Sequence, residues 1–261
     1  MLFKIEKEKC FAYLTHTACD DNNYILDFYI IPTNVHDSVA FEEIFSKVNN
    51  RYNSRIKSVA IYVGYVTPYI AKTIFDSNIL LAMPYKRTMT KKDFFKKYEY
   101  VYDEYSDCCI CPNNKTLKYS TTNKDWYREF KSNPKECVLC PLKDKCIESK
   151  NNQKLILRHL WQNYLDEANH LRHESYIKSV YRRRKETYWT CFFWCKRTTR
   201  NEIYTFKWLD KNNIWNRAYF CMHEFKKIAN KLWKSNKKSF FIPNINLLMQ
   251  ILYYKTFEIC I

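Results

Sequence analysis

Hydrophobic and polar residues alternate with two different periods along the first part of the chain. In FAYLTHTACDDNNYILDFYII the pattern predicts two strands joined by a turn at residues 20–23, the second closed by Pro32. Apolar residues then recur at helical spacing over residues 39–52, and Ser38 is the expected N-cap of that helix. This segment therefore predicts a hairpin followed by a helix.

A strand, a helix and another strand are predicted next. RIKSVAIYV predicts a strand that ends at Gly64, and TPYIAKTIFDS predicts a short helix with Thr67 as N-cap and Pro68 at its first position. NILLAMPY predicts a further strand. Alternating strands and helices are typical of an α/β fold.

The pattern changes after residue 86. Helical periodicity is weak from Lys86 to about His159, which predicts an insertion of hairpins and loops rich in cysteine. Helical spacing returns in four stretches, residues 159–173, 175–197, 215–234 and 244–257. We expect three segments: residues 1–86 as the first part of an α/β core, 87–160 as the cysteine-rich insertion, and 161–261 as helices that complete the core.

Composition points to a polyanionic partner. Lysine and arginine number 44 against 27 acidic residues, a formal net charge of +17, and nucleic acid is the first candidate for such a charge excess. No signal peptide and no apolar run of membrane-spanning length is present, so we expect a cytoplasmic protein with no membrane partner. Its 12 cysteines are then thiols or metal ligands rather than disulfides. With a single glycine, Asn and Asp are expected to form the tight turns.

Four cysteines have a spacing that suits a tetrahedral metal. One remote cysteine precedes a C-x2-C-x5-C run, which gives the set Cys111, Cys137, Cys140 and Cys146. Zn²⁺ fits this set, and the spacing also resembles that of nucleases that hold an iron–sulfur cluster. The remaining alternative is a group of reduced cysteines without metal. In either metal-bound case the role is structural, because all four positions are filled.

A basic and aromatic stretch is the second candidate site. YIKSVYRRRKETYWTCFFWCKR carries a group of cations that suits phosphate contacts, with aromatic residues beside it: Arg182, Arg183, Arg184, Lys185, Lys196 and Arg197. The alternative is an ordinary helix whose aromatic residues are core and whose cations are solvated.

Several segments together resemble the C-terminal half of DDE transposases from bacterial insertion sequences. They include FAYLTHTACD, ILDFYIIPTNVHDSVAFEEIFSKV, GYVTPYIAK, the stretch from PYKRTMTKKDF to KYSTTN, YREFKSNPKECVLCPLKDKC and FKKIANKLW, over nearly the whole chain. The resemblance implies an RNase H-like α/β core, a DNA partner (insertion-sequence ends or non-specific DNA) and a homo-oligomer. It also implies three acidic residues that hold two Mg²⁺ ions for DNA cleavage and strand transfer.

None of the three family acids stands at its expected position. The second acid precedes the glycine by two residues in the family pattern, and Tyr62 occupies that place here. The third follows a Y-x2-R frame that matches Tyr181 and Arg184, and its position is Trp189. The first belongs upstream of FAY, in a part of the family sequence that this chain does not contain. Glu186 is a weak surrogate, since one helical turn displaces a carboxylate by roughly 5 Å.

We therefore expect a truncated, catalytically inactive transposase-family protein with an RNase H-like core that lacks its N-terminal strands. The alternatives are a stand-alone nucleic-acid-binding or regulatory module without catalysis, and a fragment that does not fold well.

Overall fold

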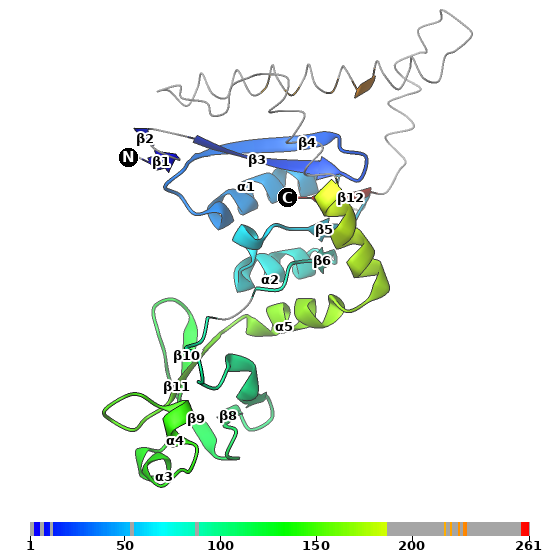
Figure 1. The fold of residues 1–261 in the computed structure, drawn as a ribbon. Coiled ribbons are helices and arrows are strands. Elements are labelled where there is room, and N and C mark those ends of the chain that lie inside the picture. The colour runs from blue at the N-terminus through cyan, green and yellow to red at the C-terminus, as the bar shows by residue number, and fades with distance from the viewer. Residues whose placement is uncertain are drawn as a thin grey trace, which may run out of the picture. The chain divides into compact units, whose positions relative to one another are not determined.

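A computed structural model describes residues 3–5, 8–10, 13–52, 55–86, 89–186, 217, 220, 224, 227, 228 and 257–260 (Figure 1). The chain divides into two compact units. Unit 1 comprises Met1–Pro84 and Glu167–Ile261, and unit 2 comprises Tyr85–Asp166. Of the helices expected in this part of the chain, residues 187–197, most of residues 215–234 and residues 244–256 lie outside the described residues.

Unit 1 is built on a mixed five-stranded sheet with the order β4-β3-β12-β5-β6. The predicted hairpin is β3 (Tyr13–Asp20) and β4 (Ile25–Pro32), which pair antiparallel. The two later predicted strands are β5 (Ile56–Ala60) and β6 (Leu80–Ala82), which pair parallel. Strands β1 (Phe3–Ile5) and β2 (Glu8–Cys10) form a separate two-stranded sheet. The α/β prediction is confirmed.

The central strand of this sheet comes from the end of the sequence given. Strand β12 (Phe257–Cys260) lies between β3 and β5, antiparallel to the first and parallel to the second. Sequence periodicity predicted a helix over residues 244–257 and no strand here, so β12 was missed. Without β12 the hairpin and the β5–β6 pair share no ladder of backbone hydrogen bonds.

Helix α1 (Asp37–Tyr52) packs against β3 and β4 through its apolar face, which consists of Ala40, Phe41, Ile44, Phe45 and Val48. The helix begins one residue before the predicted cap. The Ser38 backbone N–H donates to His36 Nδ1 at 3.2 Å, so an imidazole, rather than the Ser38 hydroxyl, satisfies a donor of the first turn. The prediction of Ser38 as N-cap was wrong.

Helix α2 (Pro68–Asp76) begins as predicted. The Thr67 hydroxyl accepts from the Ile70 backbone N–H at 3.3 Å, and Pro68 occupies the first turn, where its missing N–H costs nothing. The helix packs against β6 and buries Ile70, Ala71 and Ile74. It therefore fixes the loop that joins β5 to α2.

A third helix, over residues 175–186, packs against the same sheet of unit 1. Its Ile177 and Val180 form a buried cluster with Ala60 of β5 and Ala82 of β6. Small residues on the two parallel strands let the helix approach closely. Helix α5 (Gln162–Leu171) precedes it in the chain.

Unit 2 is an antiparallel sheet with the order β11-β10-β9-β8-β7. Its strands are β7 (Val101–Asp103), β8 (Cys108–Ile110), β9 (Thr116–Thr122), β10 (Tyr127–Lys131) and β11 (Leu155–His159). Cys109, Leu117 and Phe130 form its small core. The short helices α3 (Pro134–Val138) and α4 (Lys143–Cys146) lie between β10 and β11. This part of the chain thus combines a sheet of antiparallel strands and loops with the short helices α3 and α4, which the sequence did not predict.

Asparagine and aspartate take the turn conformations that glycine would otherwise supply. Among the described residues other than glycine, seven have a positive φ, and all but Trp126 are Asn or Asp: Asn23, Asn78, Asp93, Asp107, Asn114 and Asn152. The expectation drawn from the single glycine is confirmed.

Candidate functional site

The single glycine lies in the loop that follows β5. Gly64 has no positive φ, so backbone conformation is not the reason for glycine. The Asp37 carboxylate, at the start of α1, fills the space where a Cβ of residue 64 would stand. A Cβ at residue 64 would therefore require the Asp37 side chain to move away from this loop.

A buried histidine lies beside the same loop. His16 of β3 is 5% exposed, and its Nδ1 is hydrogen-bonded to the Tyr65 hydroxyl. Its Nε2 is also buried and has no hydrogen-bond partner among the residues that the structure describes. Burial lowers the pKa of His16, and the nearby Asp37 carboxylate opposes this shift in part. Burial therefore favours the neutral form of this imidazole in the fold.

Tyr62, where the family resemblance expects an acid, lies just past the end of β5. Its side chain is 46% exposed. The guanidinium carbon of Arg184, from the helix over residues 175–186, stands 5.4 Å from the Tyr62 ring centroid and 5.1 Å from that of Tyr181. Arg184 is only 7% exposed, so this place holds a desolvated permanent cation between two aromatic rings.

The donor set around Tyr62 does not fit Mg²⁺. Magnesium prefers carboxylate and carbonyl oxygens, and a fixed guanidinium repels a divalent cation. Within the described part of the chain, no group of three or more His, Cys, Asp and Glu side chains is arranged to hold a metal ion. Glu186 is exposed, and Asp76 pairs with Lys72. Trp189 lies outside the described residues.

The helix over residues 175–186 places its predicted DNA-binding residues differently. Arg182 and Lys185 are exposed, Arg183 is half-buried and Arg184 is buried. Lys178 is exposed as well, and the spacing of Lys178, Arg182 and Lys185 puts them on one face of the helix. We call these three residues the basic stripe. Lys196 and Arg197 lie outside the described residues.

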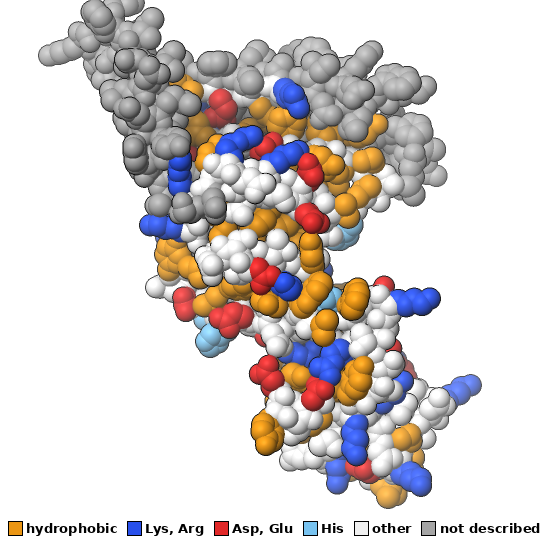
Figure 2. All heavy atoms as spheres, turned by 180° about the vertical axis from the view of Figure 1, so that it is seen from behind, with side chains coloured by type: hydrophobic (Ala, Val, Ile, Leu, Met, Phe, Trp, Pro, Cys, Tyr) orange, Lys and Arg blue, Asp and Glu red, His pale blue; other side chains and the backbone are white. Residues whose placement is uncertain are grey.

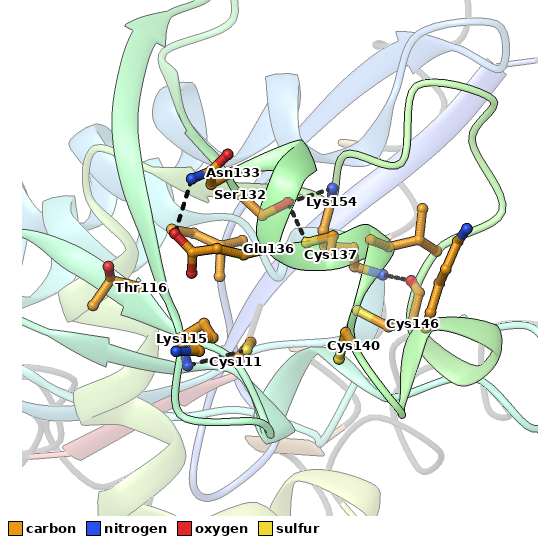
Figure 3. Close-up of a pocket in the computed structure, with 13 residues that line it drawn as sticks. Cys111, Lys115, Thr116, Ser132, Asn133, Glu136, Cys137, Cys140, Cys146 and Lys154 are labelled. Atoms are coloured by element: carbon orange, nitrogen blue, oxygen red, sulfur yellow. Dashed lines mark hydrogen bonds between the residues drawn. The ribbon is translucent and has the colours of Figure 1, made fainter.

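The four predicted metal ligands line one pocket of unit 2 (Figure 3). Cys111 follows β8, Cys137 is in α3, Cys140 follows α3, and Cys146 ends α4. Burial raises the pKa of Cys146, a shift that the Tyr100 hydroxyl and Lys154 oppose and that Cys111 and Cys137 reinforce. The four sulfurs thus share one cavity, but the geometry as it stands does not confirm a metal centre.

Two residues beside Gly64, His16 and Asp37, were not predicted from the sequence as parts of a site. His16 and Asp37 are distant in sequence and show no ligand or triad spacing, so only the packing of β3 and α1 beside the loop after β5 reveals that they meet. The glycine was the one available signal, since it marks a position where another group comes close.

Comparison with protein families yields one match. Residues 110–229 match the family model described as "Transposase DDE domain". The match includes all four pocket cysteines and the helix over residues 175–186, and begins after Gly64. No curated protein and no solved structure matches the chain. No described helix is long and apolar enough to cross a membrane.

Proposed function

We propose that this chain, whose residues 110–229 belong to the transposase DDE domain family, binds DNA without cutting it. Transposase-family function follows from the family match. We propose three further properties that the family match does not give: DNA binding, loss of catalysis and a cytoplasmic location. DDE transposases generally use Mg²⁺ to cleave DNA, and the residues around Tyr62 do not supply what that ion requires.

The observation that carries the loss of catalysis is the buried cation at Tyr62. A guanidinium 5.4 Å from the Tyr62 ring contributes positive charge where the family resemblance places a carboxylate and two divalent ions. A tyrosine is neutral at neutral pH and offers no hard anionic ligand. Tyr62 and Arg184 therefore form a packing contact at a position where a metal-ion site would need carboxylates.

DNA binding is supported by the charge of the chain and by the basic stripe. The net charge of +17 favours association with a polyanion. Figure 2 shows lysine and arginine side chains spread over the visible face, with acidic side chains among them. In the basic stripe helical spacing aligns three exposed cations, and the buried Ile177 and Val180 anchor its helix to the sheet. We propose that this stripe follows a DNA backbone.

Salt-dependent DNA binding tests this proposal. Fluorescence anisotropy with a labelled duplex measures Kd at several salt concentrations. We expect log Kd to rise linearly with the logarithm of the salt concentration, because protein that binds phosphates releases counterions. The double variant Arg182→Glu with Lys185→Glu should weaken binding and reduce the salt slope by about two, roughly one for each lost phosphate contact.

The matched control reverses two exposed cations of unit 2, Lys124→Glu with Lys150→Glu. Both double variants change the net charge equally. A larger loss of DNA affinity in the first variant would therefore show that DNA binds at the basic stripe. Equal losses in the two variants would contradict a role for the basic stripe. An absence of binding at low salt would contradict DNA binding altogether.

The second candidate function is a regulatory module that occupies DNA without catalysis. The two separate compact units favour it, because unit 2 carries its own sheet and core. Binding to the ends of an insertion sequence, compared with random DNA of equal length, distinguishes a specific regulator from a general DNA-binding protein.

A further inference from the structure

Four cysteine side chains reach one small cavity of unit 2 from three separate pieces of chain. Cys111 is in the turn between β8 and β9, where Asn114 N–H donates to the Cys111 carbonyl at 2.8 Å. Cys137 and Cys140 come from α3 and the turn after it, and Cys146 from α4. Antiparallel pairing of β8, β9 and β10 brings these segments together. The convergence is therefore a product of the fold and not of a single loop.

Each of the four sulfurs has a polar neighbour. The Lys115 backbone N–H donates to Cys111 Sγ at 3.4 Å, and Asn113 Nδ2 donates to Cys140 Sγ at 3.5 Å. The Tyr100 hydroxyl lies 3.1 Å from Cys146 Sγ. Cys137 Sγ donates to Ser132 Oγ at 3.2 Å (Figure 3). The Lys115 N–H and the Asn113 amide point at sulfur, and donors of this kind are the outer contacts that stabilise a metal-bound thiolate.

Positive charge also surrounds the cavity. Lys115, Lys143 and Lys154 line it together with the cysteines and one acid, Glu136. Cations near a thiol favour the thiolate, which is the form that binds metal. A thiolate cluster without metal carries up to four negative charges, and a divalent ion together with nearby lysines balances them better than lysines alone.

The size of the cavity favours a single ion over an iron–sulfur cluster. Its free volume is about 30 Å³, which is room for one or two water molecules. A single ion fits this space, whereas a four-iron cluster with its four sulfides requires the lining residues to move apart. A single tetrahedral ion needs the four thiolates and no further ligand.

We propose that Cys111, Cys137, Cys140 and Cys146 bind one thiophilic divalent cation, Zn²⁺, as a closed structural site that joins α3 and α4 to the β8–β9 turn. In the structure the sulfurs are not yet at ligating positions, so binding requires side-chain rotation about the shared cavity. Each Sγ–H loses its proton to solvent, and four S–Zn bonds form without any change of oxidation state. The proposal concerns unit 2 and does not depend on DNA binding.

The test uses the full chain, stripped with a chelator under reducing conditions and then titrated with Co²⁺ and Zn²⁺. Co²⁺ should bind one equivalent and give the intense thiolate charge-transfer and tetrahedral d–d bands, which Zn²⁺ then bleaches. Cys140→Ser should lose these bands. The control Cys108→Ala, a buried cysteine of β8 outside the cavity, should keep them.

A second measurement uses the wild-type chain, so its result does not depend on whether a variant folds. Alkylation of the wild-type chain with and without Zn²⁺, mapped by mass spectrometry, should show the four cavity cysteines modified at least about tenfold more slowly with metal, since metal-bound thiolates are protected. Equal alkylation with and without Zn²⁺, or Co²⁺ spectra unaltered in Cys140→Ser, would overturn the proposal. Purified protein that contains iron and acid-labile sulfide would also overturn it, in favour of a cluster.

Discussion

The Arg184 guanidinium lies 5.4 Å from the Tyr62 ring centroid and is almost fully shielded from water. This pair joins the helix over residues 175–186 to the end of β5. In the family resemblance the same two elements bear metal-binding acids. Here they are joined by a cation on an aromatic ring, and that contact stabilises the fold where the family expects chemistry.

Removal of Arg184 should destabilise the protein. Arg184→Ala deletes a desolvated cation–π contact to two rings and the packing of its aliphatic stem, and we expect a loss of about 2 kcal/mol or more in the free energy of unfolding. Urea denaturation monitored by circular dichroism measures it. Arg182→Ala, exposed on the same helix, should change stability by less than about 0.5 kcal/mol. Equal effects of the two substitutions would show that the contact to Tyr62 carries no stability.

The close approach of Asp37 to Gly64 predicts a coupled pair of substitutions. Gly64→Ala places a methyl group against the Asp37 carboxylate and should cost about 1–3 kcal/mol. Asp37→Ala opens that space, so the double variant should be at least about 1 kcal/mol more stable than the sum of the single changes predicts. A double-mutant cycle from urea denaturation measures the coupling. Strict additivity would mean that the collision is not the reason for glycine.

His16 predicts a pH dependence of known sign. Because burial lowers its pKa in the fold, the unfolded chain binds the proton more readily. Stability should therefore fall as the pH drops below about 6.5, the ordinary histidine value, and level off below the pKa of the folded protein. His16→Gln should flatten this part of the curve when unfolding free energies are measured between pH 5 and 8, a range chosen around that ordinary value (~6.5). A variant curve that keeps the full slope would assign the effect to other groups.

The central position of β12 predicts sensitivity to backbone hydrogen bonding. Ile259 is paired with Asp20 of β3 and with Val59 of β5. Ile259→Pro removes the backbone N–H and should lower the thermal midpoint or abolish cooperative unfolding, since proline is tolerated almost only at sheet edges. Ile259→Val keeps the N–H and the β-branched shape and should unfold almost as the wild type does. Equal midpoints for the two variants would contradict a structural role for β12.

Local patterns predicted the elements that local interactions determine. Thr67 and Pro68 specify the start of α2, and alternating residues specify β3 and β4, because each signal acts within a few residues. Strand β12 was missed because its place depends on two strands more than 190 residues earlier in the chain, which its own four residues cannot indicate.

The candidate site was predictable to a similar extent. Cysteine spacing identified the four side chains that share a cavity, since metal-type spacing is a short-range signal. The burial of Arg184 was not foreseen, because a run of adjacent cations looks uniformly exposed in sequence while helix geometry turns one of them inward. The proximity of His16 to Asp37 could not be predicted, because only tertiary packing brings the two residues near each other.

The most direct test of the central claim is cleavage of supercoiled plasmid by the purified, nuclease-free chain with Mg²⁺ or Mn²⁺, at protein concentrations that saturate DNA binding in the anisotropy assay. We predict bound plasmid that remains supercoiled, with no nicked or linear product above the metal-free control. Nicking that requires the divalent ion and persists through repeated purification would contradict the claim that this chain binds DNA without cutting it.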